Sequence, residues 1–142
     1  MSYGYIEHIS DVCIRAQGRT LAEAIESGAE AMFNVSFGLE TIAERETVAI
    51  NAQAPNPELL FVEVLNECLS IQGVDGLALR RIKTLEIKED NGSLYYTGTA
   101  FGEVFDKSRH AAKTEVKAAT YSGLTYKSGK DGIHVLTCVL DV

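Results

Sequence analysis

At residues 11–35 the chain reads DVCIRAQGRTLAEAIESGAEAMFNV, in which a strand pattern passes directly into a helix pattern. Apolar and polar side chains alternate from Asp11 to Gly18, which is the period of a strand with one buried face. Thr20 and Glu23 then form a capping box, and apolar residues recur behind them at three- and four-residue spacing. This segment predicts a half-buried strand followed by an amphipathic helix.

A second strand pattern and a second helix pattern follow. Residues 47–53 alternate in the same way. Asn56 and Pro57 are suited to an N-cap and a first helical position, and an apolar helical stripe continues until just before Gly73. We expect this second helix to be the most apolar element.

The second half of the chain is rich in strand patterns. Turn residues at 90–92 and 128–132 have the chemistry of hairpin turns. We therefore predict one α+β domain over residues 1–142, a two-layer fold in which both helices pack on one face of a mostly antiparallel or mixed sheet. The strands expected in this half span residues 77–88, 94–103, 115–126 and 133–140.

Composition limits the classes of function. The chain has 142 residues, 46% of them hydrophobic, which suits one compact domain. Its net charge of -7 disfavours direct contact with nucleic acid. We find no signal-peptide layout and no apolar run near the roughly 20 residues that span a bilayer, so no membrane association is expected. Three widely spaced cysteines, Cys13, Cys68 and Cys138, indicate free thiols in a reducing cytoplasm.

Sequence patterns of common enzyme sites are missing. The sequence contains no GxSxG, CxxC or HExxH and no glycine-rich phosphate loop. The apolar neighbours of Cys68 and Cys138 would raise a thiol pKa, which argues against a cysteine nucleophile. We predict a non-enzymatic protein. A metal-dependent hydrolase is the enzymatic alternative, and no general base is placed to serve it.

Acidic groups mark the beginning and the end of the predicted sheet. Asp11 opens the first strand after a polar segment that contains His8, and Asp141 precedes Val142, whose terminal carboxylate adds a second anionic group. Carboxylate oxygens are ligands for Mg²⁺, Mn²⁺ and Ca²⁺. In the alternative interpretation, Asp11 caps a turn, His8 satisfies a core hydrogen bond and the tail is solvated. Both interpretations stay open at this point.

A dense polar segment spans residues 105–121. Loops on a rigid scaffold often carry function. Alternation would place Lys113, Glu115 and Lys117 on one face, as a contact surface or a solvated sheet face. Its cations are few and no aromatic residues interleave with them, so a nucleic-acid patch is not expected.

Several motifs together resemble the archease family over nearly the full chain. They are EHISD (7–11), TLAEA (20–24), AMF (31–33), GEVFD (102–106) and HAAKTEVKAATY (110–121), together with the acidic residue one position before the end. Archeases assist RtcB-type RNA ligases, which use GTP to join RNA ends in tRNA splicing and RNA repair. The resemblance implies a protein that promotes guanylylation and repeated turnover of such a ligase.

The resemblance also implies site residues. A divalent ion, calcium, magnesium or manganese, would be held by Asp11, Asp141 and Val142. The alternative function is a chaperone-like protein that binds clients through a sheet face, which would need an exposed apolar patch. Candidate contacts to the ligase or the nucleotide are His8, His110, Lys113, Glu115 and Lys117.

One position departs from the family pattern. Many archeases have histidine after the Thr-Tyr pair, where this chain has Ser122. A serine neither titrates near neutral pH nor offers an imidazole nitrogen. Any role that needs an imidazole at this position is lost or is taken over by another histidine, for which His8 and His110 are the candidates.

Overall fold

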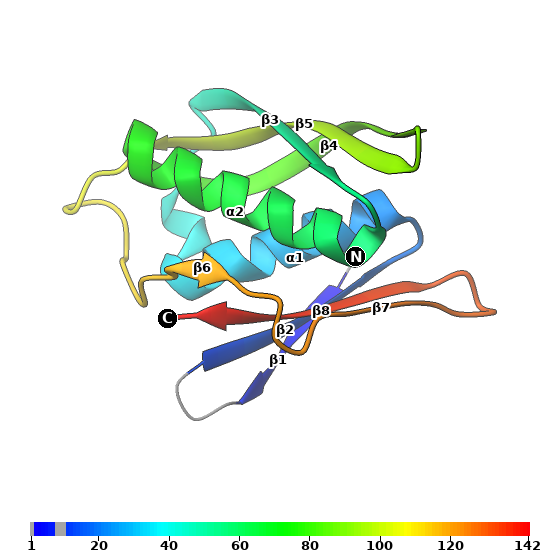
Figure 1. The fold of residues 1–142 in the computed structure, drawn as a ribbon. Coiled ribbons are helices and arrows are strands. Elements are labelled where there is room, and N and C mark those ends of the chain that lie inside the picture. The colour runs from blue at the N-terminus through cyan, green and yellow to red at the C-terminus, as the bar shows by residue number, and fades with distance from the viewer. Residues whose placement is uncertain (1, 8–10) are drawn as a thin grey trace.

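The computed structural model of the chain describes residues 2–7 and 11–142. These residues form two α-helices, a short 3-10 turn and eight strands (Figure 1). Within the described ranges, no helix is long and apolar enough to cross a membrane. In chain order the elements are β1 (Ser2–Glu7), β2 (Asp11–Gly18), α1 (Leu21–Ser36), η1 (Leu39–Thr41), β3 (Glu46–Ala54), α2 (Pro57–Asp75), β4 (Leu77–Asp90), β5 (Ser93–Val104), β6 (Ala118–Ala119), β7 (Thr125–Ser128) and β8 (His134–Asp141).

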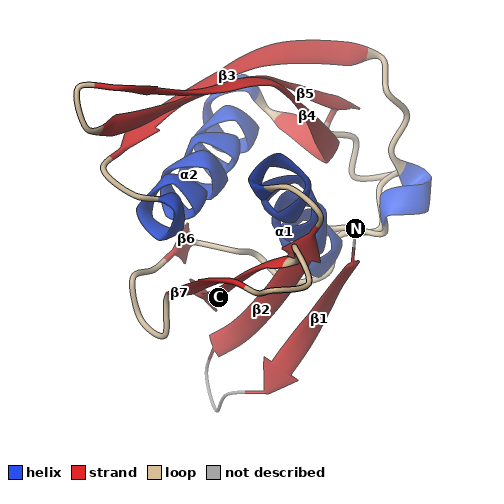
Figure 2. Cartoon of the chain, turned by 90° about the vertical axis from the view of Figure 1, so that its right-hand side faces the viewer, coloured by secondary structure: helices blue, strands red, loops and turns tan. Residues whose placement is uncertain are grey.

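The strands form two antiparallel sheets with the helices between them. One sheet has the order β1-β2-β8-β6, with β7 also paired to β8, and the other has the order β3-β5-β4. Figure 2 shows α1 and α2 in the space between the two sheets. The predicted α+β class and antiparallel pairing are confirmed. The expected single sheet is corrected to two, so that the helices are covered on both sides rather than one.

Both helices begin where the capping residues predicted. The Thr20 hydroxyl accepts a hydrogen bond from the Glu23 N–H at 3.0 Å, and the Asn56 side chain accepts one from the Leu59 N–H at 2.9 Å. Each bond satisfies a donor that the first helical turn leaves unpaired. Helix α2 continues past the predicted end because the left-handed residue that terminates it is Gly76, with φ at 65°.

The predicted strand at residues 115–126 is mostly wrong. Only the short strands β6 and β7 fall in or near it, and the chain before them runs along the end of α1. There the Gly38 N–H donates to the Ala111 carbonyl at 2.9 Å, and the Lys113 N–H donates to the Ser36 carbonyl at 2.8 Å. These two bonds form an isolated antiparallel bridge between Phe37 and Ala112, directly after α1. The second bond also satisfies a carbonyl of the last helical turn, which has no partner within the helix.

Candidate functional site

Two carboxylates face each other across the strand pair β2 and β8. Asp11 is the register partner of Asp141. Residues directly opposed in an antiparallel pair point to the same face, with Cβ atoms about 4.5–5.5 Å apart. Asp11 is half-buried and Asp141 is exposed. The fold therefore brings together the two acidic side chains nominated from opposite ends of the sequence.

The end of β8 is held on both sides. Asp141 pairs with Asp11 in β2 and with Ala118 in β6, and its carbonyl accepts a hydrogen bond from the Lys117 N–H at 2.8 Å. Val142 is partly buried against the hydrophobic core. These contacts fix the backbone at the carboxylate pair, in contrast to the solvated tail of the alternative interpretation.

The donor set suits a hard cation in part. Two facing carboxylates provide oxygen ligands of the kind that Ca²⁺, Mg²⁺ and Mn²⁺ prefer. Among the described residues, no three His, Cys, Asp or Glu side chains are grouped so that they could hold a metal ion by themselves. Further oxygens would have to come from Val142, the third residue nominated from the sequence, and from water. The candidate contact His8 lies outside the described residues.

A pocket of about 450 Å³ adjoins Asp11. Tyr5 forms one wall, and its hydroxyl donates to the Ala31 carbonyl at 3.0 Å and accepts from the Asn34 side chain at 3.3 Å. Lys113 also lines this pocket. The predicted cation of the polar segment thus borders the same pocket as the predicted metal ligand.

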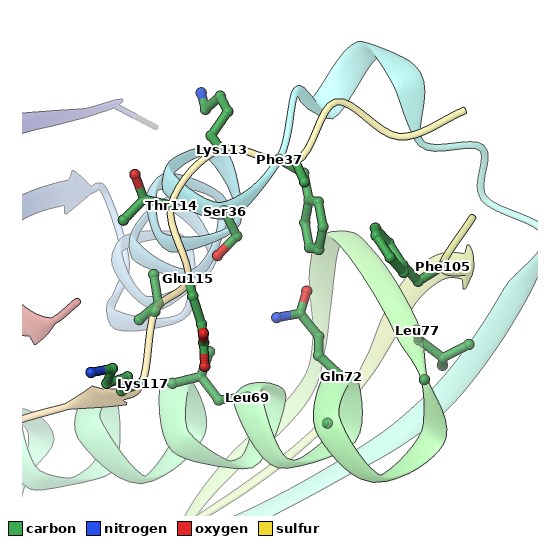
Figure 3. A pocket seen from close by; sticks show the side chains of 14 residues that line it. Ser36, Phe37, Leu69, Gln72, Leu77, Phe105, Lys113, Thr114, Glu115 and Lys117 are labelled. Atoms are coloured by element: carbon green, nitrogen blue, oxygen red, sulfur yellow. The ribbon is translucent and has the colours of Figure 1, made fainter. Parts of the chain in front are cut away.

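The segment at residues 112–117 is not a strand and does not keep the predicted alternation, because Ala112 and Thr114 are exposed as well. Lys113, Glu115 and Lys117 are exposed, whereas Val116 is buried. The segment borders a second pocket of about 600 Å³ between the C-terminal ends of α1 and α2 (Figure 3). Its charged side chains are therefore available to a partner.

His110 occupies a different position from the predicted one, because its side chain is buried. Its Nε2 lies 3.0 Å from Glu103 Oε2, and its Nδ1 accepts a hydrogen bond from the Asp106 N–H at 2.9 Å. Since Nδ1 must be unprotonated to accept, this geometry assigns the ring as neutral, with Nε2–H donating to Glu103. The burial argues against direct contact with a partner and indicates that His110 positions the loop after β5.

Glu103 is the centre of this network; it belongs to the GEVFD motif but was not nominated as a site residue from the sequence. Its buried carboxylate accepts from His110, from the Ala43 N–H at 2.7 Å and from Arg109 at 2.6 Å, with Arg45 at 3.6 Å. The hydrogen bond from His110, followed by those from Ala43 and Arg109, lowers the pKa of Glu103 to about 2. The sequence signal that could have predicted this role is a carboxylate at a position of an alternating strand that faces the core.

Ser122 lies exposed in the turn before β7, where its N–H donates to the Thr120 hydroxyl at 3.3 Å. His110 is committed to Glu103 and Asp106, so it does not replace a missing imidazole at this position.

The cysteines behave as predicted. Cys13, Cys68 and Cys138 are free and buried. Burial raises the pKa of Cys68, and it raises the pKa of Cys138 to about 12. Thiols with such pKa values are poor nucleophiles near neutral pH.

The sequence of this chain is similar to those of known archeases. Residues 3–142 match the model of the Archease protein family (MTH1598/TM1083). The protein archease of Methanosarcina barkeri is 35% identical over 130 residues, which cover 92% of this chain and 89% of that protein. The protein archease of Pyrococcus furiosus is 33% identical over 138 residues, which cover 97% of this chain and 96% of that protein.

Solved structures share the fold. The solution structure of Methanobacterium thermoautotrophicum protein 1598 superposes with a TM-score of 0.81 at 26% identity and covers 99% of this chain and 98% of that chain. The crystal structure of an archease from Thermotoga maritima, described as a possible chaperone, gives a TM-score of 0.60 at 20% identity and covers 96% of this chain and 94% of that chain. The second similarity concerns the fold alone.

Proposed function

Because this chain belongs to the archease family, we propose that it is a non-enzymatic, metal-binding partner of an RtcB-type RNA ligase. It promotes guanylylation and repeated turnover of the ligase in cytoplasmic tRNA splicing or RNA repair. The observation that carries this proposal is the register pair Asp11 and Asp141, which places two carboxylates on one face of the β2–β8 pair.

Asp11 and Asp141, together with Val142, would hold a calcium, magnesium or manganese ion. When bound, such an ion would supply positive charge where an anionic nucleotide meets its nucleophile. Lys113, which lines the same pocket as Asp11, adds a positive charge to it. Lys113, Glu115 and Lys117 are exposed and remain our candidate contacts.

The charge of the chain favours a protein partner over RNA. A net charge of -7 repels a phosphate backbone and attracts the basic surface that an RNA-binding ligase presents. Attraction of this kind raises the rate of encounter. The chain can therefore act on the ligase without contacting the RNA.

The test is multiple-turnover ligation by the partner ligase, with GTP, divalent metal and an RNA that carries a 3′-phosphate. Wild type should raise the number of turnovers, and folded Asp11→Asn and Asp141→Asn should not. Glu89→Gln, which removes an exposed carboxylate from β4, is the matched control and should behave as wild type. If wild type leaves turnover unchanged, the proposal fails.

A chaperone-like role is the second candidate, favoured by exposed apolar side chains such as Phe105, which is 40% exposed. Such a protein would suppress aggregation of unrelated unfolded clients, and its surface would bind a hydrophobic dye. A protein that acts only on its ligase is not expected to suppress the aggregation of unrelated proteins. Aggregation assays with and without the chain distinguish the two roles.

A further inference from the structure

Exposed apolar side chains gather where α2 ends and β5 ends. Val74 is 82% exposed, Val104 is 60% exposed and Phe105 is 40% exposed. The backbone joins their elements, because Val104 is the register partner of Leu77 and the Phe105 N–H donates to the Gly76 carbonyl at 2.9 Å. Apolar residues concentrated at one place on a surface mark an interaction site more often than scattered ones do.

The 600 Å³ pocket opens beside this group and has apolar walls. In Figure 3, Phe37 and Phe105 stand on one side and Glu115 and Lys117 on the opposite side, with Gln72 rising from α2 between them. The two aromatic rings contact each other, with centroids 5.7 Å apart. Further apolar lining comes from Leu69, Leu77 and Val116.

The walls of the pocket are held in place before any partner arrives. Phe105 stacks on the buried ring of His110, with centroids 5.8 Å apart, and His110 is fixed by Glu103. The opposite wall is tied to α1 through the Lys113 N–H and to β8 through the Lys117 N–H, each with a hydrogen bond of 2.8 Å. A preformed pocket avoids the cost of ordering its walls on binding.

We propose that this pocket receives an aromatic or branched aliphatic side chain of the partner ligase, which makes it the anchor point of the complex. This inference rests on the proposed function. The apolar walls of the pocket favour an apolar side chain. Glu115 and Lys117 carry one charge of each sign, which suits the backbone and polar groups on either side of such a side chain in a protein. A nucleic acid, with phosphates of one sign only, fits this rim less well.

The docking surface is continuous with the carboxylate pair. Lys113 lines both the 600 Å³ pocket and the pocket beside Asp11, and the Lys117 N–H is bonded to the Asp141 carbonyl. An anchored ligase would therefore extend across the segment at residues 112–117 to Asp11 and Asp141. Anchoring and metal positioning occupy neighbouring but separate parts of this face.

Gly73 offers a clean test. It lines the pocket on α2, and a Cβ added there would meet nothing within 4 Å. Gly73→Phe places a ring in this open space without disturbing the core, and Gly73→Ala adds a single methyl group as the matched control. Affinity for the purified ligase is measured by biolayer interferometry, and ligation turnover is measured in parallel.

We expect Gly73→Phe to weaken ligase binding by about tenfold or more, as loss of an interface anchor does, and Gly73→Ala to stay within about twofold of wild type. Phe105→Ala should weaken binding similarly, whereas Leu85→Ala, which removes an exposed apolar side chain from β4, should not. Asp11→Asn should retain binding while losing stimulation of turnover.

Three results would overturn the inference. If Gly73→Phe and Phe105→Ala both bind the ligase as wild type does, the pocket is not the anchor, although the proposed function stands when wild type stimulates turnover. If sedimentation shows a wild-type dimer that Gly73→Phe dissociates with ligase affinity unchanged, a second copy occupies the pocket. If wild type neither binds nor stimulates the ligase, the proposed function itself fails.

Discussion

Asp11 and Asp141 are register partners in β2 and β8 although they come from opposite ends of the chain. Two like charges in this arrangement repel each other unless a cation lies between them. Excess Ca²⁺, Mg²⁺ or Mn²⁺ should therefore raise the Tm of wild type by several degrees, since a ligand at 100 times its Kd stabilises a protein by about 2.7 kcal/mol. Asp11→Asn and Asp141→Asn should lose most of this increment.

Differential scanning calorimetry with added metal and with EDTA measures this effect. In EDTA the two variants should be at least as stable as wild type, because each removes one member of a repelling pair. Glu89→Gln is the control and should keep the metal-dependent increment. An equal increment in wild type and both variants would show that the ion binds elsewhere.

Glu103 should make the fold sensitive to acid. Its pKa is lowered to about 2 in the folded chain from an ordinary value of 4.5, so its stabilising contribution is complete above about pH 4.5 and is lost as the pH falls toward 2. Denaturant unfolding between pH 7 and pH 2.5 measures this dependence. Glu103→Gln should flatten the slope below pH 4.5 and should lower the Tm at pH 7 by several degrees, because His110 and Arg109 lose a charged partner.

The control for Glu103 is Glu89→Gln, an exposed carboxylate whose removal should leave the acid slope close to that of wild type. If Glu103→Gln showed the full wild-type slope, another carboxylate would have to carry the acid sensitivity.

Asn66 should anchor the short strand β6 to α2. Its side chain donates to the Ala119 carbonyl at 3.1 Å and accepts from the Ala119 N–H at 2.9 Å. The side-chain amide of Asn66 therefore pairs with the Ala119 backbone as a neighbouring strand would. Asn66→Ala should lower the free energy of unfolding by about 2 kcal/mol, at roughly 1 kcal/mol for each lost bond. Urea unfolding measures the loss. Asn51→Ala, at an exposed position of β3, should change stability by less than about 0.5 kcal/mol.

Gly28 and Gly73 should respond oppositely to alanine. A Cβ at Gly28 would lie 2.3 Å from two ring atoms of the buried Phe61. Gly28→Ala should therefore lower the free energy of unfolding by about 1–3 kcal/mol through overpacking, which exceeds the gain from the higher helix propensity of alanine. A Cβ at Gly73 meets nothing within 4 Å, so Gly73→Ala should stabilise α2 by up to about 1 kcal/mol. Thermal unfolding of both variants tests the pair. Equal effects would mean that α1 and α2 are not packed as closely as described.

Local patterns predicted the helices well because their determinants are adjacent in sequence. The Thr20 and Asn56 caps, and the hairpin turn in which Asn91 and Gly92 have φ of 50° and 78°, each depend on a few neighbouring residues. Strand β1 was missed because it is an edge strand without strict alternation. The segment near residue 115 alternates like a strand, but its donors pair with the end of α1.

The sequence by itself determined the α+β class, the helix starts, the three free cysteines and the residue types of the candidate site, because these depend on local composition and spacing. Only the tertiary structure decided that the strands divide into two sheets and that Asp11 opposes Asp141. It also decided that His110 is buried against Glu103 rather than presented to a partner. Such relationships depend on contacts between residues distant in the chain, and the periodicity of a single segment carries no information about its neighbour in space.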